Sequence, residues 1–406
     1  MSARALEMYR SVPRYLAARA LSARLPSLGA VSAAPLRLVD RPDPRPPGPG
    51  WGTVRPRLAG ICGSDLATVT GRSSFYFSPL VSLPFVPGHE VVGTLQDDLE
   101  DLPAGTRVVL DPVLSCLVRG VAPCAGCAAG QPGRCDRVTV GHICPGLQTG
   151  YCADTGGGWS RAFVAHRSQL HPVPDDLDDK RAVLVEPLAC AVRAALRTLA
   201  ESGDRVLVVG AGAVGLLTVL ALREFTTAGQ VLVVAKHRHQ AELAARFGAS
   251  EIVTPKEALG GVRRATRAIR LDPDWGPPYL LGGVDVAIDC AGTSASLETA
   301  LRTTRAGGRV VLAGLPATGT SVDLTPLWYR ELTLAGTYAS GHARVNGHRE
   351  REFVLAMDLA RRAPLDAVLS AVYPLEQWRD ALDTALGAGR LGAVKVAFDL
   401  TGWGKR

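Results

Sequence analysis

The sequence lacks an apolar segment long enough to cross a bilayer. Its longest apolar run lies between Arg205 and Arg223, VLVVGAGAVGLLTVLAL, and contains three glycines at turn-forming spacing, whereas a spanning helix needs about 20 apolar residues. No continuous apolar core follows the N-terminal arginines, which argues against a secretory signal. We therefore expect no membrane partner. An Arg-rich transit peptide is a minority alternative, confined to the residues before 35–57, which read as the first strands of the fold.

The sequence also lacks a basic stripe and a motif that reads nucleic acid. The formal net charge is +7, and residues 1–60 account for it with ten arginines, no lysine and three acidic residues. The rest of the chain is neutral, so we interpret this charge as a solvated local patch. Nucleic acid is not an expected partner.

An even cysteine framework, typical of small secreted domains, is absent. The chain has nine cysteines, and four of them cluster between Cys116 and Cys135. Without a signal peptide, clustered cysteines favour a metal site over disulfides and indicate a reducing, cytoplasmic compartment. The length of 406 residues indicates two or three domains.

Two different patterns divide the chain. Short β-type runs punctuated by Gly and Pro, such as RVVL (107–110), extend from about Leu36 to Val164, as in an irregular β-rich domain. From Glu186 onward, apolar strands alternate with helical stretches, which predicts an α/β fold with a doubly wound parallel sheet. The last sixty or so residues do not extend this alternation and could pack on the first domain. Residues 255–283 are either partly helical or a functional flap.

The motif GAGAVG indicates a dinucleotide site. It follows the strand-like VLVV and precedes an apolar helix. Gly210 permits a tight turn, Gly212 allows a pyrophosphate to approach the backbone, and Gly215 allows close helix packing. Val214 belongs to the same cofactor-binding turn, and amides at the helix N-terminus face the anion. A simple tight turn is the alternative.

The clustered cysteines form C-x2-C-x7-C, with a fourth cysteine eight residues upstream. Four thiolates on one loop give the closed tetrahedral ligand set of structural zinc. Unlinked thiols and a redox CxxC are the alternatives. The predicted ligands are Cys116, Cys124, Cys127 and Cys135.

A second ligand set is spread along the chain. GICGSD contains Cys62, PGHEVVG contains His89 and Glu90, and VEPLA contains Glu186. One sulfur, one nitrogen and one carboxylate leave a fourth position open, as in catalytic zinc sites. Asp65 could hydrogen-bond the far nitrogen of His89. Each residue taken alone is more often structural.

The chain resembles the zinc-dependent medium-chain alcohol dehydrogenases in the order of five motifs: GICGSD, GHEVVG, the four-cysteine loop, EPLA and GAGAVG. The resemblance spans nearly the whole chain. The polyol and threonine dehydrogenase branch looks closest. The resemblance implies a GroES-like catalytic domain (1–187, completed by 341–406) interrupted by a Rossmann domain (188–340). It also implies one catalytic and one structural zinc, and hydride transfer between an alcohol or ketone and a nicotinamide.

Two departures from the family concern the metal loop and the proton. Val121 stands where the family loop usually has its first cysteine, and Cys116 is the substitute. Ala67 stands where the family often has a histidine that passes the alcohol proton to solvent. The resemblance implies that Ser64 takes this proton and releases it through a cofactor ribose hydroxyl or through Glu90.

The third departure concerns the cofactor. Ala235 stands where an NAD site usually has an acid, and Lys236 and Arg238 supply cations suited to a 2′-phosphate. We therefore expect NADP, with an NAD-dependent polyol or amino-alcohol dehydrogenase as the alternative. A non-catalytic zinc-containing relative is an alternative of another class. We expect a homo-oligomer, dimer or tetramer.

Overall fold

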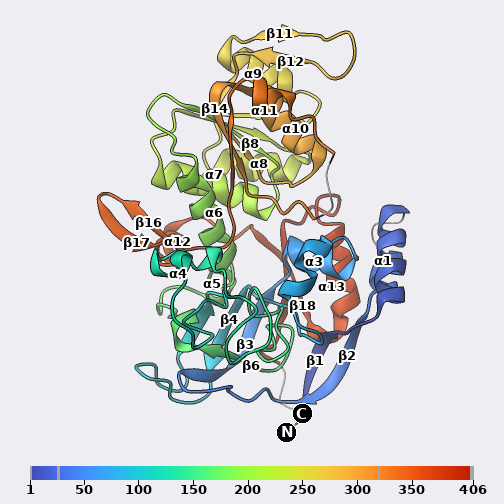
Figure 1. Cartoon of the computed structure of the whole chain (residues 1–406), viewed down its shortest axis with the longest axis vertical. Coiled ribbons are helices and arrows are strands. Elements are labelled where there is room, and N and C mark those ends of the chain that lie inside the picture. Colours follow the sequence, from blue (N-terminus) through green and yellow to red (C-terminus); the bar gives the residue numbers. More distant parts are fainter. Residues whose placement is uncertain (1, 25–27, 318–320, 403–406) are drawn as a thin grey trace. The chain divides into compact units, whose positions relative to one another are not determined.

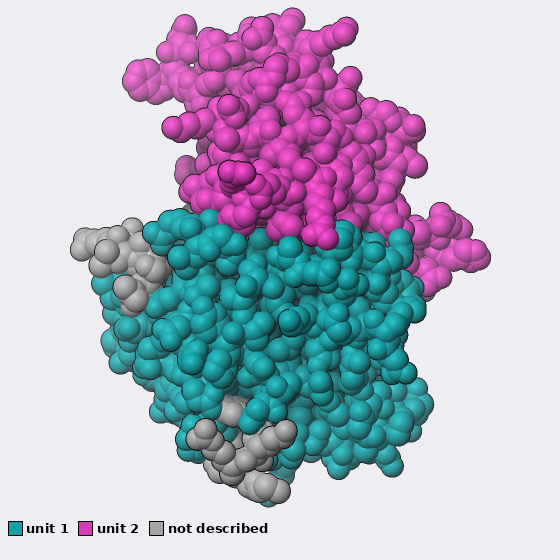
Figure 2. Space-filling model, turned by 180° about the vertical axis from the view of Figure 1, so that it is seen from behind, with its two compact units in different colours: residues 1–186, 340–342, 356–406 teal, residues 187–339, 343–355 magenta. Residues whose placement is uncertain are grey.

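The computed structural model describes residues 2–24, 28–317 and 321–402 (Figure 1). The chain forms two compact units, coloured separately in Figure 2. The first comprises Met1–Glu186, Ser340–His342 and Ala356–Arg406, and the second comprises Pro187–Ala339 and Ala343–Leu355. Residues 343–355 thus group with the second unit rather than with the catalytic domain expected for them. Within the described ranges, no helix combines the length and apolar character that a membrane span requires.

A seven-stranded sheet is the centre of the first unit. Its strand order is β18-β19-β3-β4-β5-β7, and β6 pairs with β3. Side chains on these strands, such as Phe163 and Phe398, pack with Trp159 from a connecting loop into one buried cluster. The strands are β3 (Trp51–Gly60), β4 (Val91–Leu95), β5 (Arg107–Leu110), β6 (Phe163–His166), β7 (Leu170–Pro172), β18 (Leu369–Pro374) and β19 (Lys395–Asp399).

The N-terminal segment is part of the fold of this unit, although the sequence indicated no strand before residue 35. Strand β1 (Ser2–Met8) pairs antiparallel with β2 (Leu36–Pro42). Helices α1 (Val12–Arg24) and α2 (Leu28–Ala33) lie between the two strands in sequence. Leu6 N donates to Trp159 O and Met8 N donates to Phe85 O. These contacts are distant in sequence, so local pattern could not reveal β1.

Short helices complete the first unit. The C-terminal helix and strand expected to pack on the first domain are present as α12 and β19. The helices of this unit are α3 (Gly63–Val69), α4 (Ala125–Ala128), α5 (Asp179–Ala182) and α13 (Trp378–Leu386), with 3-10 turns at Phe75–Leu80 (η1), Pro132–Arg134 (η2), Arg167–Gln169 (η3) and Leu375–Gln377 (η4). Helix α6 (Val185–Arg197) lies mostly in the second unit, and α12 (Glu352–Arg362) begins in the second unit and continues into the first.

The second unit has a six-stranded parallel sheet with the order β10-β9-β8-β13-β14-β15. The predicted alternation of strand and helix is confirmed. Buried apolar runs such as VLVV fit strands that are covered on both faces. The strands are β8 (Arg205–Val209), β9 (Gln230–Val234), β10 (Glu251–Val253), β13 (Val284–Asp289), β14 (Thr304–Leu312) and β15 (Thr333–Gly336), and the helices are α7 (Ala213–Phe225), α8 (Arg238–Arg246), α9 (Ala258–Thr266), α10 (Ser294–Thr303) and α11 (Thr325–Tyr329).

The long connection 255–283 contains α9 and an antiparallel hairpin of β11 (Ile269–Leu271) and β12 (Tyr279–Leu281). The helical segment ends at Thr266, because Arg267 adopts a left-handed φ of 58°. A second hairpin, β16 (His342–Val345) and β17 (His348–Arg351), turns at Asn346 and Gly347, which both have positive φ.

Candidate metal and cofactor sites

The first candidate metal cluster lies where β3 leads into α3. Cys62 is the N-cap residue of α3, and His89 and Glu90 directly precede β4. Because β3 and β4 are antiparallel neighbours, with Ala59 opposite Val91, the end of one strand meets the start of the other. One ligand atom each from Cys62, His89 and Glu90 lies within 4.8 Å of the other two. The structure therefore brings together three of the four residues proposed for this site.

Asp65 lies against the imidazole of His89. Its Oδ1 is 3.5 Å from His89 Nδ1, longer than an ordinary hydrogen bond, and its Oδ2 accepts from Cys62 N at 3.0 Å. Burial alone lowers the pKa of His89, but Asp65 and Cys62 outweigh it and raise this pKa well above its usual value. A buried negative partner thus holds the ring that carries the second ligand atom.

Lys395 forms a buried ion pair with Glu90. Both side chains are almost fully buried, 5% and 1% exposed. Strand β19 brings Lys395 there by pairing with β3. Burial lowers the pKa of Lys395, but the charge of Glu90 outweighs it, so the pKa is raised. Sequence reasoning missed this residue, whose one signal was a lone lysine in the apolar strand VKVAF.

Glu186, the fourth proposed ligand, is buried at the start of α6 and lies outside the 4.8 Å group. Burial raises the pKa of Glu186 to about 7, with His89 and Lys395 opposing and Glu90 and Asp111 reinforcing the shift. The site therefore concentrates a thiol, an imidazole and buried carboxylates. This donor chemistry suits zinc better than the oxygen-only sites of calcium or magnesium.

Hydroxyl groups line the site beside Asp65. Tyr151 Oη donates to Asp65 Oδ1 at 3.3 Å and lies 3.4 Å from Thr68 Oγ1, which is 3.0 Å from Ser73 Oγ. Burial raises the pKa of Tyr151 well above its usual value, Asp65 adds to this, and the Thr68 and Ser64 hydroxyls oppose it. Apart from this influence on Tyr151, buried Ser64 Oγ has no hydrogen-bond partner of ordinary geometry among the described residues. Sequence reasoning missed Tyr151, because no motif marks it.

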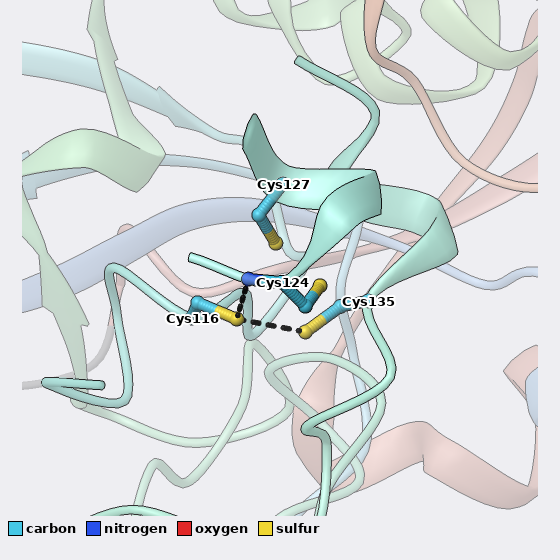
Figure 3. Close-up of side chains that lie close together, drawn as sticks. All are labelled: Cys116, Cys124, Cys127 and Cys135. Carbon is cyan, nitrogen blue, oxygen red and sulfur yellow. Dashed lines mark hydrogen bonds between the residues drawn. The ribbon is translucent and has the colours of Figure 1, made fainter. Parts of the chain in front are cut away.

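The second candidate metal cluster contains all four loop cysteines that the sequence indicated (Figure 3). Their sulfur atoms lie within 4.8 Å of one another, and Cys116 Sγ is 3.5 Å from Cys135 Sγ. Zinc–sulfur bonds of about 2.3 Å place tetrahedral sulfurs roughly 3.8 Å apart. The amides of Cys127 and Asp136 lower the pKa of Cys124 to about 6, which favours the thiolate. The set fits zinc, with Cys116 in the place left by Val121.

Arg119 fixes the main chain around these cysteines. Its side chain is fully buried, and all five N–H groups donate to main-chain carbonyls. The distances lie between 2.8 and 3.2 Å. The acceptors are Leu114 O, Val140 O, Ile143 O, Cys144 O and Gly146 O. A single guanidinium thereby joins both ends of the loop, a role without a signal in the sequence.

The glycine turn has the shape that a pyrophosphate requires. Gly210 has a φ of 103°, a left-handed conformation that favours glycine. A Cβ at Gly215 would lie 1.8 Å from Gly210 O, so the helix packs directly on the turn. A Cβ at Gly212, the N-cap of α7, would meet open space. Val214 follows in the first turn of α7. These positions fit a dinucleotide.

Ala235 directly follows β9 and is buried, and Lys236 is exposed beside it. His237 is the N-cap of α8, and its ring stacks on that of His239 at 5.8 Å. Arg238 is 94% exposed, and its Nε donates to Glu242 at 2.8 Å. Exposed cations therefore follow the end of β9, and position 235 offers no carboxylate.

Comparisons with known proteins cover most of the chain. The alcohol dehydrogenase GroES-like domain family matches residues 48–175, and the zinc-binding dehydrogenase family matches residues 213–358. The L-idonate 5-dehydrogenase of Vitis vinifera is 28% identical over 86% of this chain and 87% of its own length. The sorbitol dehydrogenase of Bacillus subtilis (strain 168) is 28% identical over 82% and 86%.

A solved structure shows the same fold. It is a protein of Sinorhizobium meliloti 1021, classed as a zinc-binding dehydrogenase and bound to NADP. The TM-score is 0.72 at 24% identity, and the match covers 98% of this chain and 99% of the other.

Proposed function

This chain belongs to the zinc-dependent medium-chain alcohol dehydrogenases, which transfer a hydride between an alcohol or ketone and NAD(P), and we propose that Cys62, His89 and Glu186 hold its catalytic metal. The observation that carries this proposal is the convergence of Cys62 and His89 beside buried carboxylates. Glu186 takes the third position, because Lys395 already neutralises Glu90. When bound, zinc supplies a Lewis acid for the substrate oxygen, and the nicotinamide exchanges the hydride.

The residues of this chain position the alcohol and move its proton. The substrate hydroxyl donates to Ser64 Oγ, which is buried and has no other hydrogen-bond partner of ordinary geometry among the described residues. Ser64 then passes its own proton to solvent. The Tyr151 and Thr68 hydroxyls offer an exit in addition to the cofactor ribose, whereas Glu90 is occupied by Lys395. Asp65 keeps His89 oriented through the close contact at Nδ1.

Elemental analysis and turnover test this assignment together. Cys62→Ser should abolish turnover and lower the zinc content by one ion per chain, while circular dichroism stays unchanged. Ser64→Ala should keep its zinc and lose turnover over the whole pH range. Ser64→Ala that turns over like the wild type would remove Ser64 from the mechanism. A wild type fully active without zinc in the first cluster would favour the non-catalytic role of these residues.

We also propose a second, structural zinc at Cys116, Cys124, Cys127 and Cys135, supported by their mutual distances. The purified protein should contain two zinc ions per chain. Cys127→Ser should release one ion and lower the unfolding temperature, because structural zinc contributes to folding. Turnover retained by the remaining folded fraction would distinguish this site from the catalytic one. A single zinc in the fully active protein contradicts the two-site proposal.

We propose NADP as the preferred cofactor. Lys236 and Arg238 are exposed cations next to Ala235, where an acid would repel a 2′-phosphate. A charge-assisted contact of about 1.5–3 kcal/mol predicts at least a tenfold preference in kcat/KM. Ala235→Asp combined with Lys236→Ser should move selectivity toward NAD. Native preference for NAD would contradict the role of these cations.

A polyol is the substrate class we propose. Named relatives act on sugar alcohols and sugar acids, and the hydroxyls of Thr68, Ser73 and Tyr151 lie in a row beside the first cluster. Steady-state kinetics with polyols, amino alcohols and simple secondary alcohols, each with both cofactors, tests the class. Higher kcat/KM for simple alcohols would exclude it.

We propose a homo-oligomer in a reducing, cytoplasmic compartment. Strand β15 ends the order of the six-stranded sheet, and Trp328 and Tyr329 of nearby α11 are 81% and 66% exposed. An edge strand beside exposed aromatic residues suits pairing with a second copy. None of the nine cysteines, all of which lie among the described residues, forms a disulfide. Light scattering that gives the mass of one chain, 42.7 kDa, would contradict the oligomer.

A further inference from the structure

The N-terminal helix α1 packs against the loop that follows α3, the helix that Cys62 caps. We call residues 71–80 the outer loop. Tyr15 Oη donates to Ser73 O, and Arg19 Nη1 donates to Gly71 O, both at 3.2 Å. The Arg19 guanidinium lies 5.4 Å from the ring centroid of Phe75, and the Tyr15 ring lies 5.9 Å from it. Two side chains of α1 therefore contact three alternate residues of the loop, Gly71, Ser73 and Phe75.

Gly71 shows how closely the helix approaches. Its φ is 68°, and a Cβ at this position would lie 2.6 Å from Tyr15 O and 2.9 Å from Arg19 N. A side chain there would push helix and loop apart. The main chains of α1 and the outer loop thus fit directly against each other, which incidental surface packing does not require.

The outer loop has little support of its own. The 3-10 turn η1 contains no buried residue, and Phe75 and Tyr76 are 59% and 77% exposed. Its start is held by three amides: that of Gly71 donates to Thr68 O, and those of Arg72 and Ser73 both donate to Ala67 O. Because a segment without a buried apolar face opens easily, contacts from α1 supply much of its order.

The loop is connected to the metal ligands by a chain of side-chain contacts. Ser73 Oγ is 3.0 Å from Thr68 Oγ1, Thr68 Oγ1 is 3.4 Å from Tyr151 Oη, and Tyr151 Oη is 3.3 Å from Asp65 Oδ1. Asp65 in turn contacts His89. A displacement of Ser73 would therefore shift the Thr68 and Tyr151 hydroxyls, which a substrate bound at the cluster would contact.

We propose that Tyr15 and Arg19 are positioning residues that hold the outer loop as a wall of the alcohol site, and so set which alcohols bind. This proposal rests on the proposed function of the Cys62 and His89 cluster. The matched catalytic family begins at residue 48, so α1 lies outside it. The N-terminal segment would thus adapt a shared site to the substrate of this protein. Loosening the wall should weaken binding of polyols more than that of a small secondary alcohol.

The test compares substitutions on two sides of the same helix. Arg19→Met and Tyr15→Phe remove the bonds to the outer loop. Arg14→Met is the matched control, because Arg14 donates to Ala34 O and Ser32 O, away from the loop. Arg19→Lys keeps a donor within reach of Gly71 O and serves as the rescue variant.

The first readout is hydrogen exchange of the outer loop, which needs neither cofactor nor activity. We expect exchange at the Arg72 and Ser73 amides to become about tenfold faster in Arg19→Met, in proportion to the lost contacts. Arg14→Met should leave it unchanged, and Arg19→Lys should restore most of the protection. Equal exchange in Arg14→Met and Arg19→Met would overturn the proposal, since it would indicate general loosening of α1.

The second readout is steady-state kinetics of the zinc-loaded enzyme. In Arg19→Met, KM for polyols should rise about tenfold while kcat for a small secondary alcohol stays within twofold, and the zinc content should not change. Faster loop exchange with an unaltered KM for every alcohol would overturn the role in selectivity. A wild type without dehydrogenase activity would refute the proposed function, yet the exchange result would still decide whether α1 orders the loop.

Discussion

Arg119→Met is the most informative perturbation of the four-cysteine loop. The substitution keeps an unbranched side chain of similar length in a fully buried site but removes five donors and one positive charge. At about 1 kcal/mol net per bond, the loss is roughly 5 kcal/mol. Relief from burying the guanidinium offsets a part of this. We expect a net destabilisation of about 3 kcal/mol, which is about 6–12 °C in the unfolding temperature of a unit of this size.

Metal retention should change as well. Four thiolates around a divalent ion carry a net negative charge, and Arg119 is a buried cation beside them. Removing it should speed the release of zinc to a chromophoric chelator by about tenfold, because about 1.4 kcal/mol of favourable charge interaction corresponds to this factor. Arg119→Lys should fall in between, since an ammonium keeps the charge but cannot span five carbonyls.

The control lies in the same loop. Arg137 is exposed and makes one main-chain bond there, from Nη1 to Ala122 O at 2.9 Å. Calorimetry and chelator kinetics of Arg119→Met and Arg137→Met should therefore differ strongly. If the two variants unfold at the same temperature and release zinc at the same rate, Arg119 does not organise the loop and this reasoning fails.

Three further predictions concern other buried positions. Lys395→Met leaves Glu90 buried without its partner and should cost about 3–5 kcal/mol in calorimetry, whereas Lys395→Arg should recover most of it. Burial raises the pKa of Asp289, so its stabilising contribution is complete below the unfolded value near 3.8 and is lost as pH rises through the folded value. Asp289→Asn should thus gain more stability at pH 7 than at pH 4 in urea unfolding, and equal gains would contradict burial as the cause. Gly71→Ala should lower the unfolding temperature through contact with α1, and an unchanged temperature would show that the helix yields freely.

The sequence alone determined those features that depend on neighbouring residues. A strand, a glycine turn and a helix follow one another around Gly210, and each is visible in a run of neighbouring residues: an apolar strand-like run, closely spaced glycines and an apolar helical stretch. The clustering of the four cysteines was predictable for the same reason, because Cys135 follows Cys116 by 19 positions and short spacing limits where the thiols can go. The ordered motifs around Cys62 and His89 were sufficient to indicate the family.

Only the tertiary structure decided which distant residues complete these sites. Lys395 meets Glu90 across 305 positions of sequence because β19 pairs with β3, and no local pattern encodes that pairing. Tyr151 reaches Asp65 in the same way, from a loop without a motif. The N-terminal helix α1 packs on the outer loop through side chains that read, in the sequence, as an arginine-rich patch. Burial and pairing, which arise when strands far apart in sequence become neighbours, gave these ordinary residues their partners.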